Sequence, residues 1–314
     1  MLSKESIQKQ MEELKSEYGN WSFNIPLPFA LWTNDELQLP HTRLKRIVQI
    51  VSDLSYKPLS ECRILDLGCL DGMFSIEFAQ QGAETIGVEI REANIKKAIF
   101  CKEVLGLQNL NFRQDDVRNI SIKSDGKFDV IVCSGILYHL LAEDVINLIQ
   151  TMFEMVSRVV VIDTHVALEP KKSILHDNNK YWGRTYREHS KSDTPAKKAK
   201  KLWASADNPE SFWFTRPSLV NILSNTGFSS VYECFIPAHL NFGRPGIESK
   251  DRCTFVALKN ESRQLKTSPK ANSLKESWPE RSLSYSRKGF IQDSFRLLCK
   301  KLQKKNFNLT TNNE

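Results

Sequence analysis

Two glycines four residues apart, Gly68 and Gly72, lie in the stretch LDLGCLDGMF, and Asp66 and Asp71 lie beside them. A loop of this kind between a buried strand and a helix closes its backbone around a ligand. The two aspartates would repel a pyrophosphate, whereas they would attract a ligand that carries an ammonium and a sulfonium. The loop therefore favours a cationic ligand over a dinucleotide.

Further acidic residues follow the next two strand-like runs. Glu89 ends the run GVEI, and Asp115 and Asp116 follow NFRQ. Ligands of open α/β sheets bind at the carboxyl ends of the strands, so these side chains should meet at one edge. A carboxylate after the second strand can accept two hydrogen bonds from a ribose diol. S-adenosylmethionine offers this diol together with an ammonium and a sulfonium, and its carboxylate suits the positive end of a helix that begins near Met73.

The elements that must position these residues alternate regularly. Strand-like runs occur at CRILDLG, TIGVEI, LNFRQD, KFDVIVCSG and RVVVIDT. Apolar residues at helical spacing fill 73–81, 93–105 and 142–155, whereas 117–125 is too short for more than a turn or two. Apolar strands that alternate with helices predict a parallel sheet covered on both faces.

The end of this region predicts how the sheet closes. RPSLVNILSNTGF reads as a helix that ends at Gly227, and SVYECFIP and RCTFVALK read as an antiparallel pair of strands. We therefore predict an α/β fold with a doubly wound, mostly parallel, seven-stranded sheet and an antiparallel C-terminal hairpin.

The chain divides into four predicted parts. Residues 1–61 form a helical N-terminal lead-in, and 62–259 form the Rossmann-like domain, with residues 166–216 inserted as an aromatic lid. Residues 260–289 are rich in Ser, Lys, Arg and Pro and predict a disordered linker. Residues 290–305 predict a basic amphipathic helix, which leaves open docking on its own domain or a sister subunit, contact with an anionic membrane surface, or RNA binding.

Charge and cysteine usage restrict the function classes. The net charge is +7, but residues 260–314 contain twelve Lys or Arg and five Asp or Glu, so residues 1–259 carry 32 of each sign. The body of the protein thus shows no bulk basic excess that would indicate nucleic acid. The N-terminus does not resemble a signal peptide, and no run approaches the roughly 20 apolar residues of a membrane span. The seven cysteines include no C-x-x-C pair. We expect reduced thiols, no metal site and a cytoplasmic location.

Taken together, LDLGCLDG, GVEI, QDDV and FDVIVCSGILYHL resemble the motifs of the class I S-adenosylmethionine-dependent methyltransferases, in order and at that family's spacing. The resemblance covers residues 62–259. It implies that S-adenosylmethionine is the cofactor and that the residues that bind it are Asp66, Gly68, Leu70, Gly72, Glu89, Asp116, Val117 and Cys133. Leu70 replaces the family's usual middle glycine, and because a Cβ disfavours positive φ we expect extended backbone there.

Catalytic candidates should follow the fourth and fifth strands, facing the sulfonium. SGILYHL places Tyr138 and His139 there, and VIDTHVA places His165. Methyl transfer is an in-line displacement that depends mainly on positioning, and a general base is needed only if the acceptor must lose a proton. Each histidine is therefore a candidate base or substrate ligand, with a packed structural role as the alternative, and Tyr138 is a candidate to close the pocket.

Residues 166–216 should form a lid over the acceptor, because an insertion after the fifth strand overhangs the carboxyl edge of the sheet. The predicted substrate-binding residues are Trp182, Arg184, Arg187 and Arg216. Aromatic side chains with interspersed arginines suit a planar or sugar-like acceptor that bears negative charge. We expect Trp203 and Phe212 to fill the insertion's own small core.

Three functions remain open at this stage. The first is methyl transfer to a small-molecule acceptor, for example an oxygen of a sugar, lipid head group or secondary metabolite. The second is modification of tRNA, since GILYH is similar to methyltransferases that act on the wobble uridine, although the neutral body of the chain argues against a nucleic-acid partner. The third is a non-catalytic scaffold that contacts a membrane through the C-terminal helix. The sequence does not indicate the oligomeric state.

Overall fold

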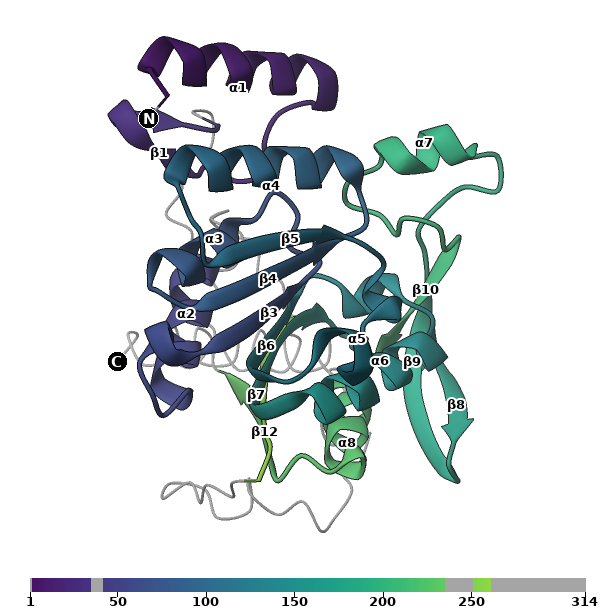
Figure 1. The fold of residues 1–314 in the computed structure, drawn as a ribbon. Coiled ribbons are helices and arrows are strands. Elements are labelled where there is room, and N and C mark those ends of the chain that lie inside the picture. The colour runs from purple at the N-terminus through teal and green to yellow at the C-terminus, as the bar shows by residue number, and fades with distance from the viewer. Residues whose placement is uncertain (1, 35–41, 235–250, 261–314) are drawn as a thin grey trace, which may run out of the picture.

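The computed structural model describes residues 2–34, 42–234 and 251–260. A seven-stranded sheet in the order β11-β12-β7-β6-β3-β4-β5 forms its centre (Figure 1). Its strands are β3 (Arg63–Leu67), β4 (Glu84–Glu89), β5 (Leu110–Gln114), β6 (Phe128–Ser134), β7 (Val156–His165), β11 (Ser230–Cys234) and β12 (Arg252–Leu258).

Strand directions confirm the predicted fold class. The pairs among β3, β4, β5, β6 and β7 are parallel, whereas β12 pairs antiparallel with both β7 and β11. The order reverses between β3 and β6, which is where open α/β sheets form their binding crevice. The fold is therefore Rossmann-like, with the predicted antiparallel C-terminal strands.

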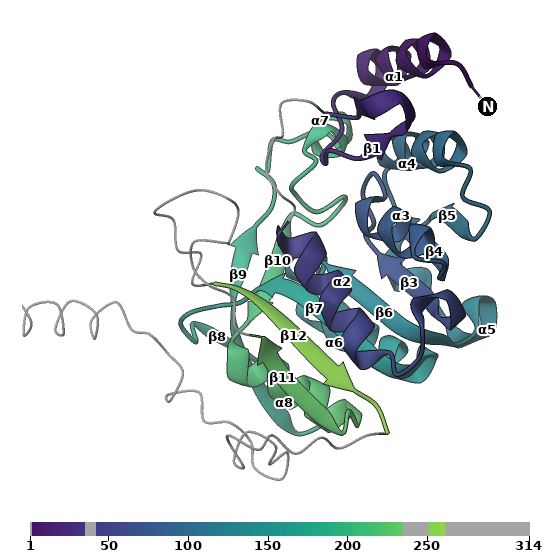
Figure 2. The same cartoon turned by 90° about the vertical axis from the view of Figure 1, so that its left-hand side faces the viewer.

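Helices cover both faces because the central strands are apolar on both sides. The predicted helices lie at α3 (Met73–Gln80), α4 (Glu92–Leu105), α6 (Ala142–Met155) and α8 (Arg216–Thr226), and the short linker forms η3 (Val117–Asn119) and α5 (Ile122–Asp125). One hydrophobic core contains buried residues of α6 and α8, and the other contains those of α3, α4 and α2 (Thr42–Leu54). In Figure 2, α2 crosses the face of the sheet toward the viewer.

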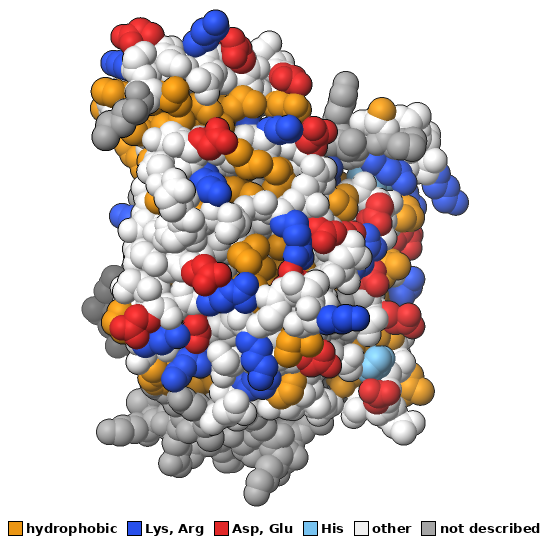
Figure 3. Space-filling view, viewed as in Figure 1, with side chains coloured by type: hydrophobic (Ala, Val, Ile, Leu, Met, Phe, Trp, Pro, Cys, Tyr) orange, Lys and Arg blue, Asp and Glu red, His pale blue; other side chains and the backbone are white. Residues whose placement is uncertain are grey.

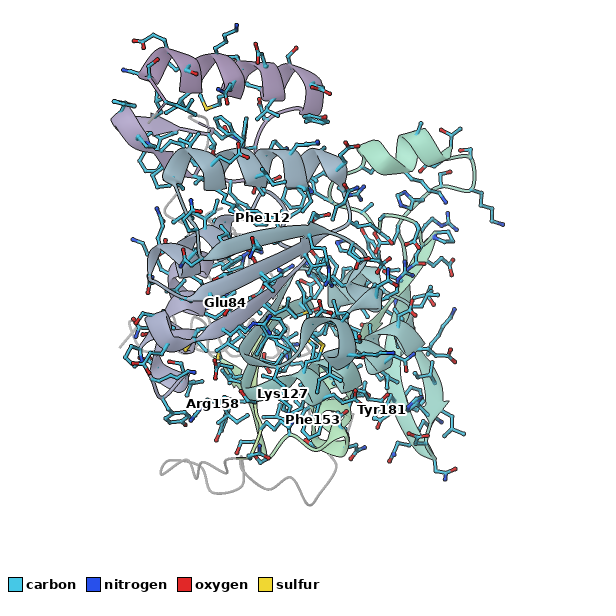
Figure 4. All side chains as sticks on the ribbon, viewed as in Figure 1. Glu84, Phe112, Lys127, Phe153, Arg158 and Tyr181 are labelled. Carbon is cyan, nitrogen blue, oxygen red and sulfur yellow. The ribbon has the colours of Figure 1, made fainter. Side chains whose placement is uncertain are left out.

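Close packing between α4 and the sheet shapes the glycine-containing loop. Phe112 of β5, labelled in Figure 4, lies beneath α4. A Cβ added to Gly72 would lie 2.7 Å from the Phe112 ring and 3.2 Å from the Ala98 Cβ of α4. Gly72 also has a φ of 89°, so both space and backbone conformation require glycine at the start of α3.

The N-terminal lead-in docks on this domain. It consists of α1 (Lys4–Tyr18), which packs on α4, a small hairpin of β1 (Pro26–Leu27) and β2 (Leu31–Trp32), and α2. Between α1 and the hairpin, the backbone N–H groups of Ser22 and Phe23 donate to Asp71, and the Lys97 ammonium donates to the Asn20 carbonyl. Ser22 and Phe23 are thereby tied to the loop after β3, and Asn20 is tied to α4.

The insertion after β7 forms a second sheet. Strands β8 (Lys172–His176), β9 (Asn179–Arg187) and β10 (Glu210–Phe214) pair antiparallel in the order β10-β9-β8, and α7 (Pro195–Lys200) lies between β9 and β10. Tyr181 of β9, also labelled in Figure 4, accepts a hydrogen bond from Asn225 of α8. The insertion is therefore packed against the main domain.

Acidic and basic side chains are interspersed over the face in Figure 3, without a large area of one sign. None of the helices in the described residues has the length and apolar character to span a membrane. The six described cysteines are free. Residues 261–289 of the predicted linker 260–289 and the predicted helix 290–305 lie outside the described residues.

Candidate active site

A pocket opens at the carboxyl ends of β3, β4 and β6. It encloses about 930 Å³, including its open mouth, and its wall contains the predicted residues Gly68, Leu70, Glu89, Asp116, Val117, Tyr138 and His139. These residues come from four separate segments of the chain. The sheet topology therefore brings together most of the residues that the motifs singled out.

The loop after β3 holds its shape through the backbone. The N–H groups of Gly68 and Cys69 both donate to the Val88 carbonyl, and Leu70 donates its N–H to the Glu89 carboxylate at 3.1 Å. Leu70 has a φ of 50°, so the expectation of extended backbone there is wrong. The hydrogen bond to Glu89 gives the physical reason, because it stabilises the left-handed conformation despite the Cβ.

Glu89 is the buried carboxylate of the pocket wall. It is 4% exposed and accepts hydrogen bonds from the backbone N–H groups of Leu70 and Arg91. Burial raises its pKa, while these donors act in the opposite direction. Its position at the end of β4 suits a ribose diol, which would supply further donors to the same two oxygens.

Asp116 lines the pocket but is already bound to a partner. Both of its carboxylate oxygens accept from the Arg118 guanidinium, at 3.0 Å from Nε. Arg118 also forms ion pairs with Asp144 and Asp207. A purine amino group at this place would therefore share Asp116 with Arg118.

Three predicted cofactor residues lie outside the pocket wall. Asp66 is 1% exposed, and the Ser75 hydroxyl of α3 donates to it at 2.6 Å. Cys133 faces the hydrophobic core because it alternates with Ser134, which lines the pocket. Gly72 faces Phe112.

Asp71 likewise points away from the pocket, toward the backbone of Ser22 and Phe23. Neither Asp66 nor Asp71 lines the pocket, because both carboxylates are turned inward to partners within the protein, and their direct contact with a cationic ligand stays a prediction.

His139 is paired with a carboxylate that the sequence reasoning missed. Its Nδ1 lies 3.1 Å from both carboxylate oxygens of Glu188, which is buried and also accepts from Ser205 N–H and Ser211 Oγ. Although burial raises the pKa of Glu188, the hydrogen bond from His139 holds it below its usual value. An ionised carboxylate only accepts, so Nδ1 carries the proton and Nε2 is left as the basic nitrogen.

Tyr138 and His165 belong to an aromatic cluster beside the pocket. The Tyr138 ring meets His165 edge-on at 4.7 Å, and His165 stacks on Trp213 at 5.0 Å. His165 Nδ1 also lies 3.2 Å from Asp251. Tyr138 lines the main pocket, whereas His165 lines a smaller cavity of about 210 Å³ behind it. The structure therefore removes His165 from the group of residues that face the pocket.

Three arginines surround Asp163 at the end of β7. Arg46 lies 3.2 Å and Arg43 3.8 Å from its oxygens, and Arg252 donates from Nε at 2.6 Å. Asp163 is completely buried, and although burial raises its pKa, Arg252 and Arg43 hold it below the usual value. Of these arginines, Arg43 lines the pocket.

A segment of the insertion covers one side of the pocket. We name residues 202–207 the lid segment; all six line the pocket. Arg91 donates to the carbonyls of Lys201, at 3.1 Å, and Ala204, at 2.8 Å, while Arg118 binds Asp207 at 2.6 Å. Trp203 is 65% exposed, so the expectation that it fills a core is wrong, whereas Phe212 is buried in the main core.

The predicted substrate residues do not reach this pocket. Arg184 lies over the Trp213 ring at 4.2 Å, and Arg216 pairs with Glu233 at 3.0 Å. Trp182 is covered by the Lys180 ammonium at 4.5 Å. Arg187 is exposed at the end of β9, where it is paired in register with Glu210 of β10. These four residues belong to the outer insertion sheet and the start of α8, whereas the lid segment is the part that overhangs the pocket.

Several pocket residues were not anticipated, namely Phe23, Arg43, Arg91 and Arg118, whereas the lid segment belongs to the insertion 166–216 that was expected to overhang this edge of the sheet. Arg91 and Arg118 follow Glu89 and Val117 by one or two positions, so proximity to the motifs could have indicated them. Phe23 and Arg43 come from the lead-in, and no local sequence signal connects them to the sheet edge.

Comparison with known proteins gives a match to one family model. Residues 58–208 match the family model described as a methyltransferase domain. The ubiquinone biosynthesis O-methyltransferase of Rickettsia prowazekii (strain Madrid E) is 24% identical over 144 residues, which are 45% of this chain and 54% of the relative. The enzyme of the same name from Acinetobacter baumannii (strain AYE) is 27% identical over 77 residues, 24% of this chain and 32% of the relative. The chain thus spans about half or less of the length of these relatives.

Solved structures show the same fold. The N-terminal domain of EvdMO1 with bound S-adenosylhomocysteine has a TM-score of 0.62 and 23% identity, covering 82% of this chain and 97% of that domain. A structure of that domain in the presence of S-adenosylhomocysteine and D-fucose has a TM-score of 0.61 and 24% identity over the same shares.

Proposed function

Residues 58–208 of this chain are a class I S-adenosylmethionine-dependent methyltransferase domain, and from this premise we propose that the protein methylates a hydroxyl group of a small-molecule acceptor. The observation that carries the proposal is His139, which lines the same pocket as Glu89 and Asp116 and is held through Nδ1 by the buried Glu188. A histidine oriented by a buried carboxylate suits removal of a proton from a hydroxyl.

The residues of the pocket fit S-adenosylmethionine as the cofactor. Glu89 offers buried carboxylate oxygens for the ribose, and Asp116 and Val117 suit the adenine edge and ring. The loop at Gly68 and Leu70 leaves space beside them for the methionine part. The cofactor supplies an electrophilic methyl group on a sulfonium.

The chain's own groups then act on the acceptor. Glu188 keeps the proton on Nδ1 of His139, so Nε2 can accept the proton of the acceptor hydroxyl as its oxygen becomes the nucleophile. Tyr138 and the lid segment limit the space in which the acceptor moves, which favours in-line attack and excludes water.

A small acceptor is supported by the pocket and by the relatives. All residues of the lid segment line the pocket, so an acceptor would be enclosed between them and the strand ends, which suits a small ligand. Two relatives are named as O-methyltransferases of ubiquinone biosynthesis, and one structural neighbour was determined in the presence of D-fucose. A hydroxylated ring, aromatic or sugar, is consistent with both.

Substitution of the pair tests the assignment. Metabolite extracts incubated with labelled S-adenosylmethionine identify an acceptor, and His139→Gln and Glu188→Gln are then compared with His176→Gln. His176 lies on β8, away from the pocket, and is the matched control. We expect losses of roughly 10²–10⁴-fold in kcat/KM for His139→Gln, unchanged binding of S-adenosylhomocysteine, and normal activity of the control. Equal turnover by His139→Gln and wild type would remove His139 as the base.

Action on tRNA is the weaker alternative. Residues 1–259 have no net positive charge to attract the phosphates of tRNA, although the basic segment 260–314 could supply it. If methyl transfer rises with total tRNA and that rise collapses with added salt, the small-molecule assignment fails.

A further inference from the structure

The peptide groups of Ser205, in the lid segment, are held on both sides. The Ser205 N–H donates to the Glu188 carboxylate at 3.0 Å, and the Ser205 carbonyl lies 2.7 Å from Nε2 of His189. Ser205, Glu188 and His189 are 4%, 8% and 3% exposed, so water does not replace these contacts. Because a carbonyl oxygen only accepts, His189 carries a proton on Nε2. The two consecutive side chains that follow β9 therefore fix one residue of the lid segment.

The carboxylate that holds Ser205 is also the one that orients His139. Besides these two groups, Glu188 accepts from Ser211 Oγ at 2.6 Å. A buried carboxylate that loses one donor still bears the cost of desolvation, so it moves toward water or toward another donor. The position of Glu188 beside His139 thus depends on where the lid segment places Ser205.

A second contact joins the end of the lid segment to the same histidine. Asn208, which follows the lid segment, donates its side-chain amide to the His139 carbonyl at 3.4 Å and its backbone N–H to Ser205 Oγ at 3.1 Å. The two residues after β9 also donate their backbone N–H groups to the Pro209 carbonyl. Displacement of the lid segment would therefore disturb His139 at its ring and at its backbone.

The other side of the lid segment is bonded to the part of the pocket that suits the adenosine of the cofactor. Arg91, two residues beyond the end of β4, donates to the Ala204 carbonyl at 2.8 Å. Arg118 joins Asp207 of the lid segment to Asp116. One short segment thus connects the predicted adenosine site with the carboxylate that orients the base.

We propose that the lid segment positions the base of the hydroxyl methylation: His189 fixes Ser205, Ser205 fixes Glu188, and Glu188 keeps the proton on Nδ1 of His139. His189 is thus a positioning residue that acts through the lid segment. This inference rests on the proposed function for the role of His139 as base. The link between the lid segment and the protonated nitrogen of His139 exists independently of turnover.

Nuclear magnetic resonance of the histidine rings tests this link without an acceptor. The full chain, with isotope-labelled histidine and saturating S-adenosylhomocysteine, reports which nitrogen of neutral His139 carries the proton, and His139→Gln identifies these signals by their loss. In His189→Leu the donor to Ser205 is absent but the size of the side chain is similar. The amide of His189→Gln can donate from about the place of Nε2. His176→Leu changes a histidine on β8, outside the lid segment, and is the control.

We expect His139 to be protonated on Nδ1 in the wild type, in His189→Gln and in the control. His189→Leu should show a mixture of the Nδ1–H and Nε2–H forms, because the hydrogen bond to one ring nitrogen decides which nitrogen is protonated. An unchanged Nδ1–H form in a folded His189→Leu protein would overturn the inference.

A second variant serves if His189→Leu does not fold. The amide of His189→Asn lies near the place of Nδ1, on the side of Asp193, which is 3.9 Å from Nδ1 in the wild type. This variant keeps a buried polar partner for Asp193 but does not reach Ser205. It should give the same mixture of forms, and Nδ1–H alone would again contradict the proposal.

Methyl transfer from labelled S-adenosylmethionine to a metabolite extract separates this inference from the proposed function. At saturating cofactor, His189→Leu should lose about 10-fold in rate, a part of the roughly 10²–10⁴-fold that a general base contributes, and His189→Gln should recover most of it. If the protonated nitrogen changes as expected while all variants transfer methyl groups at the wild-type rate, the lid segment positions His139 but His139 is not the base. The proposed function then fails, whereas the link between the lid segment and His139 stands.

Discussion

At the scale of single residues, the acidic side chains near the glycine loop are all buried but differ in whether they line the pocket. Sequence reasoning treated Asp66, Asp71 and Glu89 as one set of ligand carboxylates. In the structure, Glu89 alone of these three lines the pocket. Asp66 instead accepts a hydrogen bond from Ser75, and Asp71 accepts hydrogen bonds from backbone N–H groups of the lead-in. Of these three side chains, Glu89 is therefore the one placed to contact a ligand, whereas the two aspartates are bound to groups of the protein.

Asp66 predicts an unusual pH dependence of stability. Burial raises its pKa to about 7 against a usual value of 3.8. Between these values the unfolded chain releases the proton and the folded chain keeps it. The free energy of unfolding should therefore fall as pH rises from 4 to 7, by up to about 1.4 kcal/mol per pH unit from this group.

Asp66→Asn removes this titration, so its stability relative to the wild type should increase from pH 4 to 7 and then level off. Urea denaturation of the ligand-free proteins at several pH values measures the difference. Asp71, whose pKa burial raises to about 6, remains in both proteins and cancels in the comparison. A constant difference between the two proteins across this range would show that Asp66 is ionised in the folded state.

At Leu70, whose φ is positive, replacement by glycine should give a more stable protein than replacement by alanine. Alanine and glycine both remove its packing, but only glycine also removes the cost of φ at 50°, roughly 1–2 kcal/mol for a residue with a Cβ. Leu70→Gly should therefore unfold at a higher denaturant concentration than Leu70→Ala, although glycine is ordinarily the less stable of the two. The reverse order would indicate that the loop relaxes out of the left-handed conformation.

At the scale of elements, periodicity and spacing predicted the sheet and its helices because buried strands and amphipathic helices have local patterns. Residues at strand ends were also accessible to prediction, since the topology places Gly68, Glu89 and Val117 at one edge. Arg43 and Glu188 could not be predicted in this way, because the lead-in brings Arg43 to the pocket and the insertion brings Glu188 to His139. Their positions depend on tertiary packing, which leaves no periodic signal in the sequence.

Arg91 should stabilise the lid segment locally, because its guanidinium donates to the carbonyls of Lys201 and Ala204. In Arg91→Gln, amide hydrogen exchange of residues 201–207 should become faster, because local opening no longer breaks these hydrogen bonds. The strands β8 and β9 should exchange at the wild-type rate. Lys96→Gln, an exposed change of the same charge on α4, is the control. Uniform acceleration across the insertion would instead indicate general destabilisation.

At the scale of the whole molecule, the net positive charge lies in a different part of the chain from the residues that form the sheet. The described sheet ends with β12 at Leu258, and residues 261–314 carry all of the net charge of +7. Residues that line the pocket all precede residue 208. Catalysis and any electrostatic attachment are thus assigned to different parts of the sequence.

Removal of residues 261–314 should therefore leave cofactor binding intact. The shortened chain has no net formal charge, and calorimetry should give the same affinity for S-adenosylhomocysteine as the full chain does. Binding to anionic vesicles or to total tRNA, if the full chain shows either, should disappear, because it depends on positive charge that the shortened chain lacks. Loss of cofactor affinity on truncation would mean that residues beyond 260 complete the pocket, and the separation of the two roles would then be wrong.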